Sequence, residues 1–580
     1  MSRYDNSSSP EKAVLWHLNY LHIMRIISLI LISIFLVHCK PTEQLPLPEE
    51  IDYSVWDNAT VYFLLTDRFN DGDPSNNYVH TTENPPAPYR GYMGGDLRGI
   101  IDKLNEGYFT DLGVHAIWMS PFVEQIKGSV DEGTGNSFGF HGYWTRDWTA
   151  IDPKFGTEDD LKELVKTAHA KGIRVLIDVV ANHTGPVTSS DPVWPAEWVK
   201  TGPRCQFNSA ETTINCTLVE NLPDIRTEST DEVDLPPFLI AKWKSEGRYD
   251  VEVRELDVWF EDTGYSRTPV NYILKWLVDF IKKYGVDGFR VDTVKHTEAD
   301  VWSDLWKAAF DAYEIYKSKH SDPILDEDED FYMVGEVYNY FIKDGRWFDY
   351  GDEKVDFFDH GFKSLINFDF KTDAEKDYQT IFNKYDRILQ GEMTGKTVLN
   401  YIASHDDGSP FDIERERSIE AATKLLLCPG GVQIYYGDES ARTLTVEADG
   451  DARLRSFMNW DEMDEDEDDT SINRKAILEH WQKLGQFRMH NPSVGAGKHE
   501  QISANPYVFK RTLQKKNIEN TVLVGLDLSE GTKSIDVDDV FSEGQKVYDA
   551  YSETSAVVSN GKVSIDSPYD LVLLQAEKTE

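Results

Sequence analysis

Cysteine and positive charge are scarce in this sequence. Lysine and arginine number 59 against 102 aspartate and glutamate residues, which gives a formal net charge of −43. Such a surface repels phosphate backbones and anionic lipid headgroups, so we expect no nucleic-acid partner. A neutral substrate and bound cations remain compatible with this charge, and solubility alone explains most of the acidity.

The sequence contains only four cysteines. Cys205 and Cys216 lie close together in a polar, loop-like segment, and in an exported protein that spacing predicts one disulfide closing a short loop. A zinc site is the alternative, but no second cysteine pair or close histidine pair accompanies them. Cys428 lies in the apolar stretch LLLCPGGVQIYY and is predicted to be a buried thiol.

The apolar run from Ile26 to Val37 is too short to span a membrane comfortably as a mature helix. It follows a basic residue and has the form of a secretory signal, so we expect an exported protein. Cys39 comes next, as in a bacterial lipoprotein signal, although His38 stands where that pattern usually has a small residue. We expect an upstream segment and a signal or lipoprotein signal within 1–39 and a tether over 40–54. We also expect a periplasmic or cell-envelope location, with membrane contact only through a lipid on Cys39.

A glycine-rich phosphate loop is also missing after the first predicted strand, which argues against an open doubly wound sheet. Short β-branched and aromatic runs alternate with helical patterns, and such runs fit strands buried on both faces of a parallel sheet. The predicted strands are 61–65, 115–119, 173–180, 286–291, 332–337, 365–369, 398–403 and 432–436. Eight such βα units predict an α/β fold, a (β/α)8 TIM barrel.

Two segments depart from this alternation. Residues 185–268 are irregular and carry tryptophan, proline and the cysteine pair, which predicts a domain inserted after the third strand. From 491 to 580, short alternating strands with turn signals replace the helical periodicity, which predicts a C-terminal antiparallel β-sandwich. The barrel itself is then expected in two parts, 55–184 and 269–490.

Three acidic residues end predicted barrel strands: Asp292 in GFRVDTVKH, Glu336 in VGEVY and Asp406 in YIASHDD. The catalytic groups of such barrels lie at that edge. Any one of the three could instead cap a helix or form an ion pair in a loop. Together, and flanked by Arg290 and His405, they predict an active site.

This arrangement suits hydrolysis of a glycosidic bond with retention, which needs one ionised and one protonated carboxyl group beside the anomeric carbon. Arg290 precedes Asp292 by two residues, so both side chains leave the strand on one face and the guanidinium keeps Asp292 ionised. Asp292 is therefore predicted to be the nucleophile. Glu336 has no cation beside it in sequence and suits the acid/base, while Asp406 suits a carboxylate that stabilises the transition state.

Six motifs resemble those of the α-amylase superfamily of glycoside hydrolases, in order and in spacing. They are HGYWTRDW (141–148), DVVANH (178–183), LPDIRTE (222–228), GFRVDTVKH (288–296), the glutamate of GEVY (335–338) and SHDD (404–407). Stretches such as MGGDLRGI, FVEQIKG and HWQKLGQFRMHNPSVGAGK are most similar to the periplasmic α-amylases of Gram-negative bacteria. The resemblance runs from about residue 55 to the end of the sequence and implies endo-hydrolysis of α-1,4-glucan.

The resemblance implies roles for single residues as well. The three carboxylates keep the roles given above. The residues around the sugar at the cleavage point would be His141, Tyr143, His183, Arg290 and His405, with Lys295 on the leaving-group side. The Tyr143 ring would stack on the apolar face of that sugar, although without the motif a core aromatic would explain it better.

Calcium is the cofactor that the resemblance implies. A structural Ca²⁺ between the barrel and the inserted domain would be held by the Asn182 side chain, Asp224 and the His296 carbonyl, oxygen ligands that suit this ion. A second set resembles an N-terminal calcium loop of cyclodextrin glucanotransferases, with ligands on Asp71, Asp73, Asn76, Asn77, the Gly94 carbonyl and Asp96. Without the resemblance both sets would be turn residues, and the second does not have the EF-hand spacing.

Other activities of the superfamily share the three carboxylates, so α-glucosidase, cyclomaltodextrinase and glucanotransferase stay open. LPDI at 222–225 favours α-amylases over α-glucosidases, and no starch-binding module follows the predicted sandwich, which argues against the transferases. A non-catalytic glucan-binding lipoprotein is a further alternative, which the presence of all three carboxylates disfavours. We expect a monomer with an α-glucan substrate.

Overall fold

The computed structural model describes residues 53–577, with gaps at 321–324, 326–328, 445, 465–471 and 517. The predicted signal, Cys39 and most of the predicted tether lie outside the described residues. Within the described part of the chain, every helix is too short or too polar to span a membrane.

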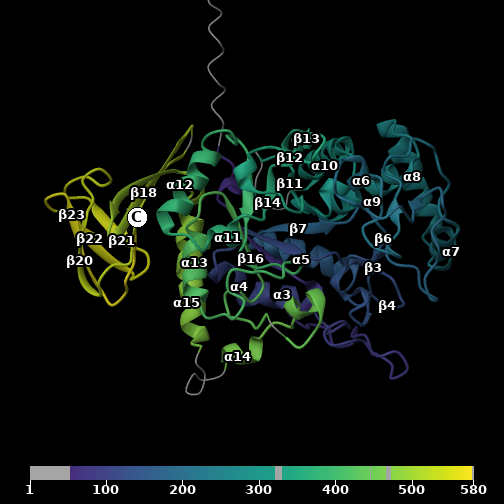
Figure 1. The fold of residues 1–580 in the computed structure, drawn as a ribbon, viewed down its shortest axis with the longest axis horizontal. Coiled ribbons are helices and arrows are strands. Elements are labelled where there is room, and N and C mark those ends of the chain that lie inside the picture. Colours follow the sequence, from purple (N-terminus) through teal and green to yellow (C-terminus); the bar gives the residue numbers. More distant parts are fainter. Residues whose placement is uncertain are drawn as a thin grey trace, which may run out of the picture. The chain divides into compact units, whose positions relative to one another are not determined.

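Eight parallel strands close into a barrel (Figure 1). In chain order they are β1 (Thr60–Leu64), β2 (Ala116–Met119), β7 (Arg174–Val179), β10 (Gly288–Val291), β11 (Tyr332–Gly335), β14 (Ser364–Asn367), β15 (Thr397–Asn400) and β16 (Gly431–Tyr435). Each pairs with the next in this order, and β16 pairs back onto β1. Every residue in them is buried, because side chains fill the barrel and helices cover it. The predicted TIM barrel is confirmed.

Helices outside the barrel return the chain from one strand to the next. They include α3 (Leu97–Glu106), α5 (Glu158–Ala170), α9 (Pro269–Tyr284), α10 (Ala299–Lys319), α12 (Tyr378–Leu389), α13 (Ser418–Leu426) and α15 (Arg474–His490). The limits of α9 follow from its sequence. Pro269 occupies the first turn, where a backbone N–H has no helical acceptor, and Gly285 ends the helix in the left-handed conformation at φ 70°.

A long insertion follows β7, the third barrel strand along the chain. It contains β8 (Val199–Lys200), α6 (Glu211–Ile214), β9 (Asp224–Ile225), α7 (Pro237–Ser245) and α8 (Tyr249–Thr263). A disulfide joins Cys205 to Cys216 in this insertion, so the predicted bond is confirmed. Helix α7 contacts an antiparallel ribbon that follows β2 and consists of β3 (Val123–Gln125) and β6 (Thr145–Ile151). Cys428 is buried, as predicted.

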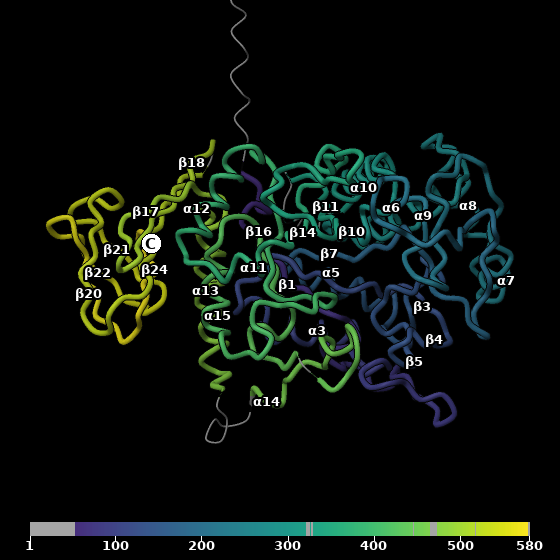
Figure 2. The backbone as a smooth tube through the Cα atoms, in the orientation of Figure 1, coloured from purple at the N-terminus to yellow at the C-terminus, as the bar shows by residue number. Residues whose placement is uncertain are grey.

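The chain beyond α15 forms two antiparallel sheets, coloured yellow-green to yellow in Figure 2. One has the order β17-β18-β19-β24-β21-β22, and the other pairs β20 with β23. The strands are β17 (Lys498–Ala504), β18 (Tyr507–Lys515), β19 (Ile518–Leu526), β20 (Gly531–Asp536), β21 (Lys546–Asp549), β22 (Thr554–Val557), β23 (Lys562–Ser567) and β24 (Val572–Ala576). Alternate side chains of both sheets, such as Leu523 and Ile565, share one apolar core. The predicted C-terminal β-sandwich is therefore confirmed.

Candidate active site

Two of the acidic residues noted in the sequence, Asp292 and Glu336, meet a further carboxyl group, that of Asp178, at the carboxyl edge of the barrel. Asp292 comes directly after β10 and Glu336 directly after β11, and these strands are neighbours. Asp178 lies in β7, on the other side of β10, where Arg290 is its register partner. Because parallel strands end at one edge, three segments far apart in sequence deliver their carboxyl groups to the same place.

Arg290 joins these three carboxyl groups. Its Nη1 atom lies 2.7 Å from Asp292 Oδ1 and 2.9 Å from Asp178 Oδ1. Its Nη2 atom lies 3.4 Å from Glu336 Oε1. The Arg290 side chain is only 1 % exposed, so solvent screens these contacts little. The contact with Asp292 was predicted from the two-residue spacing, whereas the cation near Glu336 was missed because it comes from another strand.

The Glu336 carboxyl group holds a proton more tightly than an exposed glutamate does. Burial raises the pKa of Glu336 to about 8, and the nearby Asp292 and Asp406 act in the same direction against Arg290. The Thr293 N–H donates to Glu336 Oε2 at 3.0 Å. Thr293 has a left-handed backbone conformation at φ 49°, which costs conformational free energy for a β-branched residue. Such strained residues cluster at functional sites.

Asp178 contacts the same nitrogen of Arg290, Nη1, as Asp292 does. Its Oδ2 accepts a hydrogen bond from Tyr143 Oη at 2.8 Å and another from Trp118 Nε1 at 3.1 Å. Burial raises the pKa of Asp178 to about 6, although the Arg290 guanidinium acts in the opposite direction. Asp178 therefore orients both the guanidinium and the Tyr143 ring, a role for which its place within a strand gave no specific signal.

Asp406 lies in the loop after β15 and contacts a histidine and an arginine. His405 Nε2 lies 2.9 Å from Asp406 Oδ2, and Arg455 Nη2 contacts Asp406 Oδ1. Burial alone would raise the pKa of Asp406, but His405 and Arg455 hold it well below its usual range. Arg455 also donates from Nε to the His405 carbonyl at 3.1 Å. Sequence reasoning missed Arg455, because it belongs to the loop after β16 and no motif marks it.

The predicted sugar-binding side chains cluster beside these acids. The Tyr143 ring lies parallel to His405, with centroids 5.3 Å apart, and to His141, with centroids 5.8 Å apart. His183 Nε2 lies 3.1 Å from the Tyr143 carbonyl oxygen. The structure therefore brings together all four of these residues from three separate loops.

Lys295 lies in η3 (Val294–His296), in the loop that follows Asp292. Its Nζ atom donates to the Tyr338 carbonyl at 3.1 Å and lies 5.3 Å from the Tyr338 ring centroid and 5.5 Å from that of Phe207. Phe207 is 54 % exposed and Tyr338 is 46 % exposed, so both rings are open to solvent. Neither ring was noted in the sequence; for Tyr338 the available signal was its place two residues after Glu336.

The first predicted calcium set lies where the insertion meets the barrel. Asp224 forms a β-bridge with His183, the residue that follows Asn182 in the sequence. Thr297 Oγ1 lies 3.5 Å from Asn182 Oδ1. Asp224 Oδ1 and Asn182 Nδ2 are buried without a hydrogen-bond partner. His296, the third member, precedes Thr297 and points its Nδ1 atom at the Thr213 carbonyl, 2.8 Å away.

The second predicted set forms a linked group of loop residues. Asn77 Nδ2 donates to Asp71 Oδ2 at 2.7 Å, and Asn76 Nδ2 donates to Asp96 Oδ2 at 3.0 Å. Three of its side-chain oxygens are buried without a partner: Asp71 Oδ1, Asn76 Oδ1 and Asn77 Oδ1. Asp96 also accepts the Asp73 N–H and caps α3 through the Gly99 N–H, so its oxygens are already occupied. The Gly94 backbone lies against the Asn77 amide.

A model of the catalytic domain of α-amylases matches residues 63–497 of the chain. The chain belongs to the α-amylase family. The periplasmic α-amylase of Escherichia coli (strain K12) is 36 % identical in an alignment of 501 positions that covers 76 % of this chain and 68 % of that protein. A cyclomaltodextrin glucanotransferase of Bacillus sp. (strain 1011) is 29 % identical in an alignment of 492 positions that covers 81 % of this chain but 60 % of the relative.

Solved α-amylase structures share the fold. The α-amylase of Anoxybacillus superposes with a TM-score of 0.60 at 24 % identity, covering 91 % of this chain and 100 % of its own. The α-amylase of Geobacillus thermoleovorans, solved with acarbose, superposes with a TM-score of 0.61 at 20 % identity. That superposition covers 91 % of this chain and 100 % of the other. At these identities the likeness extends to the fold alone.

Proposed function

We propose that the protein hydrolyses internal α-1,4-glucosidic bonds of starch, maltodextrins or glycogen with retention of configuration. The observation that carries this proposal is the buried Arg290 guanidinium in contact with both Asp292 and Glu336. Asp292 Oδ1 lies 2.7 Å from the guanidinium in a charge-assisted contact, while burial raises the pKa of Glu336 to about 8. The periplasmic α-amylase at 36 % identity supports the substrate class.

In the first step the Asp292 carboxylate attacks the anomeric carbon, and a covalent glycosyl-enzyme forms as the glycosidic bond breaks. Glu336 gives its proton to the departing oxygen and becomes a carboxylate. In the second step Glu336 takes a proton from water, the water oxygen attacks the same carbon, and Asp292 leaves. Each residue then returns to its starting protonation state, because the proton lost in the first step is regained in the second.

Asp406 would stabilise the positive charge that develops on the sugar ring. Its pKa lies well below the usual range, so it stays ionised throughout the working pH range. His141, His183 and His405 would bind hydroxyl groups of the same sugar, and the Tyr143 ring would pack on its face. The exposed rings of Phe207 and Tyr338 beside Lys295 would support the leaving glucan chain.

The stereochemistry of the product tests this function. Proton NMR of maltoheptaose during hydrolysis should show the α-anomer of the new reducing end first, followed by mutarotation. A β-anomer as first product would require an inverting mechanism and would overturn the assignment of Asp292. Release of glucose alone would contradict internal cleavage.

Glycosyl transfer is the second candidate, because cyclomaltodextrin glucanotransferases are among the relatives at 29 % identity. The glycosyl-enzyme on Asp292 would then be attacked by a sugar hydroxyl rather than by water. Cyclodextrins among the products of soluble starch would favour this activity over hydrolysis. We infer hydrolysis as the main activity from the higher identity to the periplasmic α-amylase.

Calcium fits the first predicted set and the Asp71, Asn76 and Asn77 oxygens of the second, whereas the Asp96 oxygens already accept hydrogen bonds. Among the described residues no cluster of three or more His, Cys, Asp and Glu side chains is arranged for a metal ion, but these sets also use amide and carbonyl oxygens. The unpartnered buried oxygens of Asp71, Asn76, Asn77 and Asp224 are groups that a bound cation would satisfy. Burial raises the pKa of Asp224 to about 7, a cost that a bound cation would remove.

Calcium removal tests this assignment. Binding stabilises the folded state, so chelation should lower the melting temperature, and re-addition of Ca²⁺ should restore it. Asp224→Asn should abolish the part of the shift that belongs to the first set, and Asp71→Asn the part that belongs to the second. A melting temperature insensitive to chelator would contradict both sites.

We propose that the protein is exported to the periplasm or the cell envelope. The related periplasmic α-amylase and the Cys205–Cys216 disulfide support it, because disulfides persist in oxidising compartments. Lipidation of Cys39 is a separate proposal that mass spectrometry of the protein from membranes would test.

A further inference from the structure

A groove of about 790 Å³ lies between helix α7 and the β3–β6 ribbon, and none of the three catalytic carboxylates lines it. Three segments contribute to its wall: Tyr78 from the loop before α3, Glu124 and Arg146 from the ribbon, and Lys242 and Ala241 from α7. Its volume lies within the range of roughly 300–1,000 Å³ that is typical of small-molecule sites.

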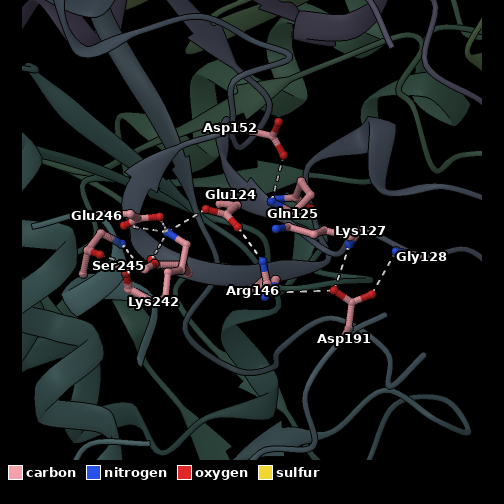
Figure 3. A network of polar contacts seen from close by, with 12 residues as sticks. Glu124, Gln125, Lys127, Gly128, Arg146, Asp152, Asp191, Lys242, Ser245 and Glu246 are labelled. Carbon is pink, nitrogen blue, oxygen red and sulfur yellow. Dashed lines mark hydrogen bonds and ion pairs between the residues drawn. The ribbon is translucent and has the colours of Figure 1, made fainter. Parts of the chain in front are cut away.

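Opposite charges alternate along the groove (Figure 3). Arg146 Nη1 lies 2.7 Å from Glu124 Oε1, and Lys242 Nζ lies 2.7 Å from Glu124 Oε2 and 3.0 Å from Glu246 Oε1. Both cations therefore already have carboxylate partners. An anion bound by Arg146 or Lys242 would have to break one of these ion pairs, whereas a hydroxyl group can donate to the carboxylate and accept from the ammonium group without breaking it.

An aromatic face borders these polar groups. Tyr78 is 37 % exposed at the groove, and Phe238 of α7, which also lines it, is half-buried. Lys154 Nζ lies 2.8 Å from Asp152 Oδ1 and 5.9 Å from the Tyr78 ring centroid, so an ion pair stands beside the ring. A pyranose has an apolar C–H face and a rim of hydroxyl groups. The Tyr78 ring suits the apolar face, and the ion pairs suit the hydroxyl groups.

The ribbon also connects this groove with the active site. Gln125 lines the groove, and its Oε1 accepts a hydrogen bond from the Trp144 N–H at 2.8 Å. Trp144 directly follows Tyr143, which belongs to the candidate active site. One ribbon therefore separates the two places, and a polymeric substrate is long enough to occupy both.

We propose that this groove is a second binding site for a neutral α-glucan chain, separate from the active site. The proposal rests on the proposed function, because that function makes a neutral polyhydroxylated polymer the protein's own ligand. A chain held at the groove raises the effective concentration of further glucan at the active site.

Titration calorimetry of the Asp292→Asn variant with maltoheptaose tests the proposal, because this variant binds substrate without cleaving it. We expect two maltoheptaose molecules per chain. Ala241→Arg fills the groove from an exposed helical position that tolerates arginine, so this variant should bind one maltoheptaose molecule per chain. Tyr78→Ala, which removes the ring, should weaken the same site at least tenfold. Lys244→Ala is the matched control, since Lys244 is exposed on the same helix but does not line the groove. This variant should still bind two maltoheptaose molecules per chain.

The active-site variant Tyr143→Ala separates this proposal from the proposed function. If Tyr143→Ala loses one of the two binding sites and Ala241→Arg loses the other, the result supports both the proposed function and the second site. A single site that responds to Tyr143→Ala but not to Ala241→Arg or Tyr78→Ala overturns the second site alone. A single site that responds only to the groove variants supports the groove and contradicts the proposed function. Inorganic phosphate that competes with maltoheptaose for the groove would make it an anion site and overturn the proposal.

Discussion

Arg290 and Lys242 each contact three carboxyl groups, with opposite consequences. Arg290 meets Asp178, Asp292 and Glu336, and burial raises the pKa of Glu336 to about 8. Lys242 meets Glu124, Asp147 and Glu246. Although burial acts to raise the pKa of Asp147, Lys242 and Arg248 lower it.

The difference lies in the number of cations and in the access of water. The carboxylates around Lys242 have further partners, since Arg146 contacts Glu124 and Arg248 contacts Asp147. The Arg290 side chain is 1 % exposed, against 12 % for Lys242. Where carboxyl groups outnumber cations in a buried place, one of them keeps its proton and can act as an acid. Where the charges balance near solvent, the same residue types only hold elements together.

The largest effect is expected from Asp292→Asn, which removes the proposed nucleophile. Hydrolysis of maltoheptaose should fall on the order of 10⁴-fold in kcat, because no glycosyl-enzyme can form. Binding of maltoheptaose should change little, since an asparagine side chain has nearly the same volume as the aspartate that it replaces. Hydrolysis by this variant at the wild-type rate would show that another group attacks the anomeric carbon.

Arg455→Met should lower kcat on the order of 10²-fold, because Asp406 loses a partner that keeps it ionised and oriented. Arg455→Lys, which keeps the charge, should recover part of this loss. Arg453→Met is the matched control: Arg453 lies two residues away and donates to the Gly408 carbonyl, so its loss should change kcat by less than about twofold. Equal losses in both variants would assign the effect to the loop rather than to Arg455.

The pH profile depends on the proton of Glu336. In the proposed mechanism the protonated form is the active one, so kcat/KM should fall above about pH 8, roughly tenfold per pH unit. In Asp406→Asn a nearby negative charge is gone, so the pKa of Glu336 should drop and the alkaline limb should move to lower pH. An alkaline limb that stays in place in Asp406→Asn would mean that another group controls it.

The smallest effect is expected at the balanced cluster. Arg248→Met removes one of two cations beside the buried Asp147, which should lower the free energy of unfolding by about 1–3 kcal/mol in urea titrations. The hydrolysis rate of the folded protein should not change. Arg254→Met, an exposed change on the same helix α8, should cost under about 0.5 kcal/mol. A rate loss in Arg248→Met would show that this cluster also serves catalysis.

Much of the fold was predictable because it follows from local patterns. Runs that are apolar on both faces marked all eight barrel strands, and short alternating runs marked the C-terminal sheets. Some runs continue past the strand: the predicted strand 398–403 ends at Asn400. There the chain turns into the loop that carries Asp406, and apolar composition alone does not mark a turn.

The sequence by itself determined which acids stand at the carboxyl edge of the barrel, because strand ends and the spacing of Arg290 and Asp292 are local properties. Tertiary structure alone decided that Glu336 keeps its proton, that Arg455 holds Asp406, and that α7 and the ribbon enclose a groove. The physical reason is the range of the interactions. A pKa depends on burial and on charges supplied by distant segments, and a groove exists only between elements that have packed.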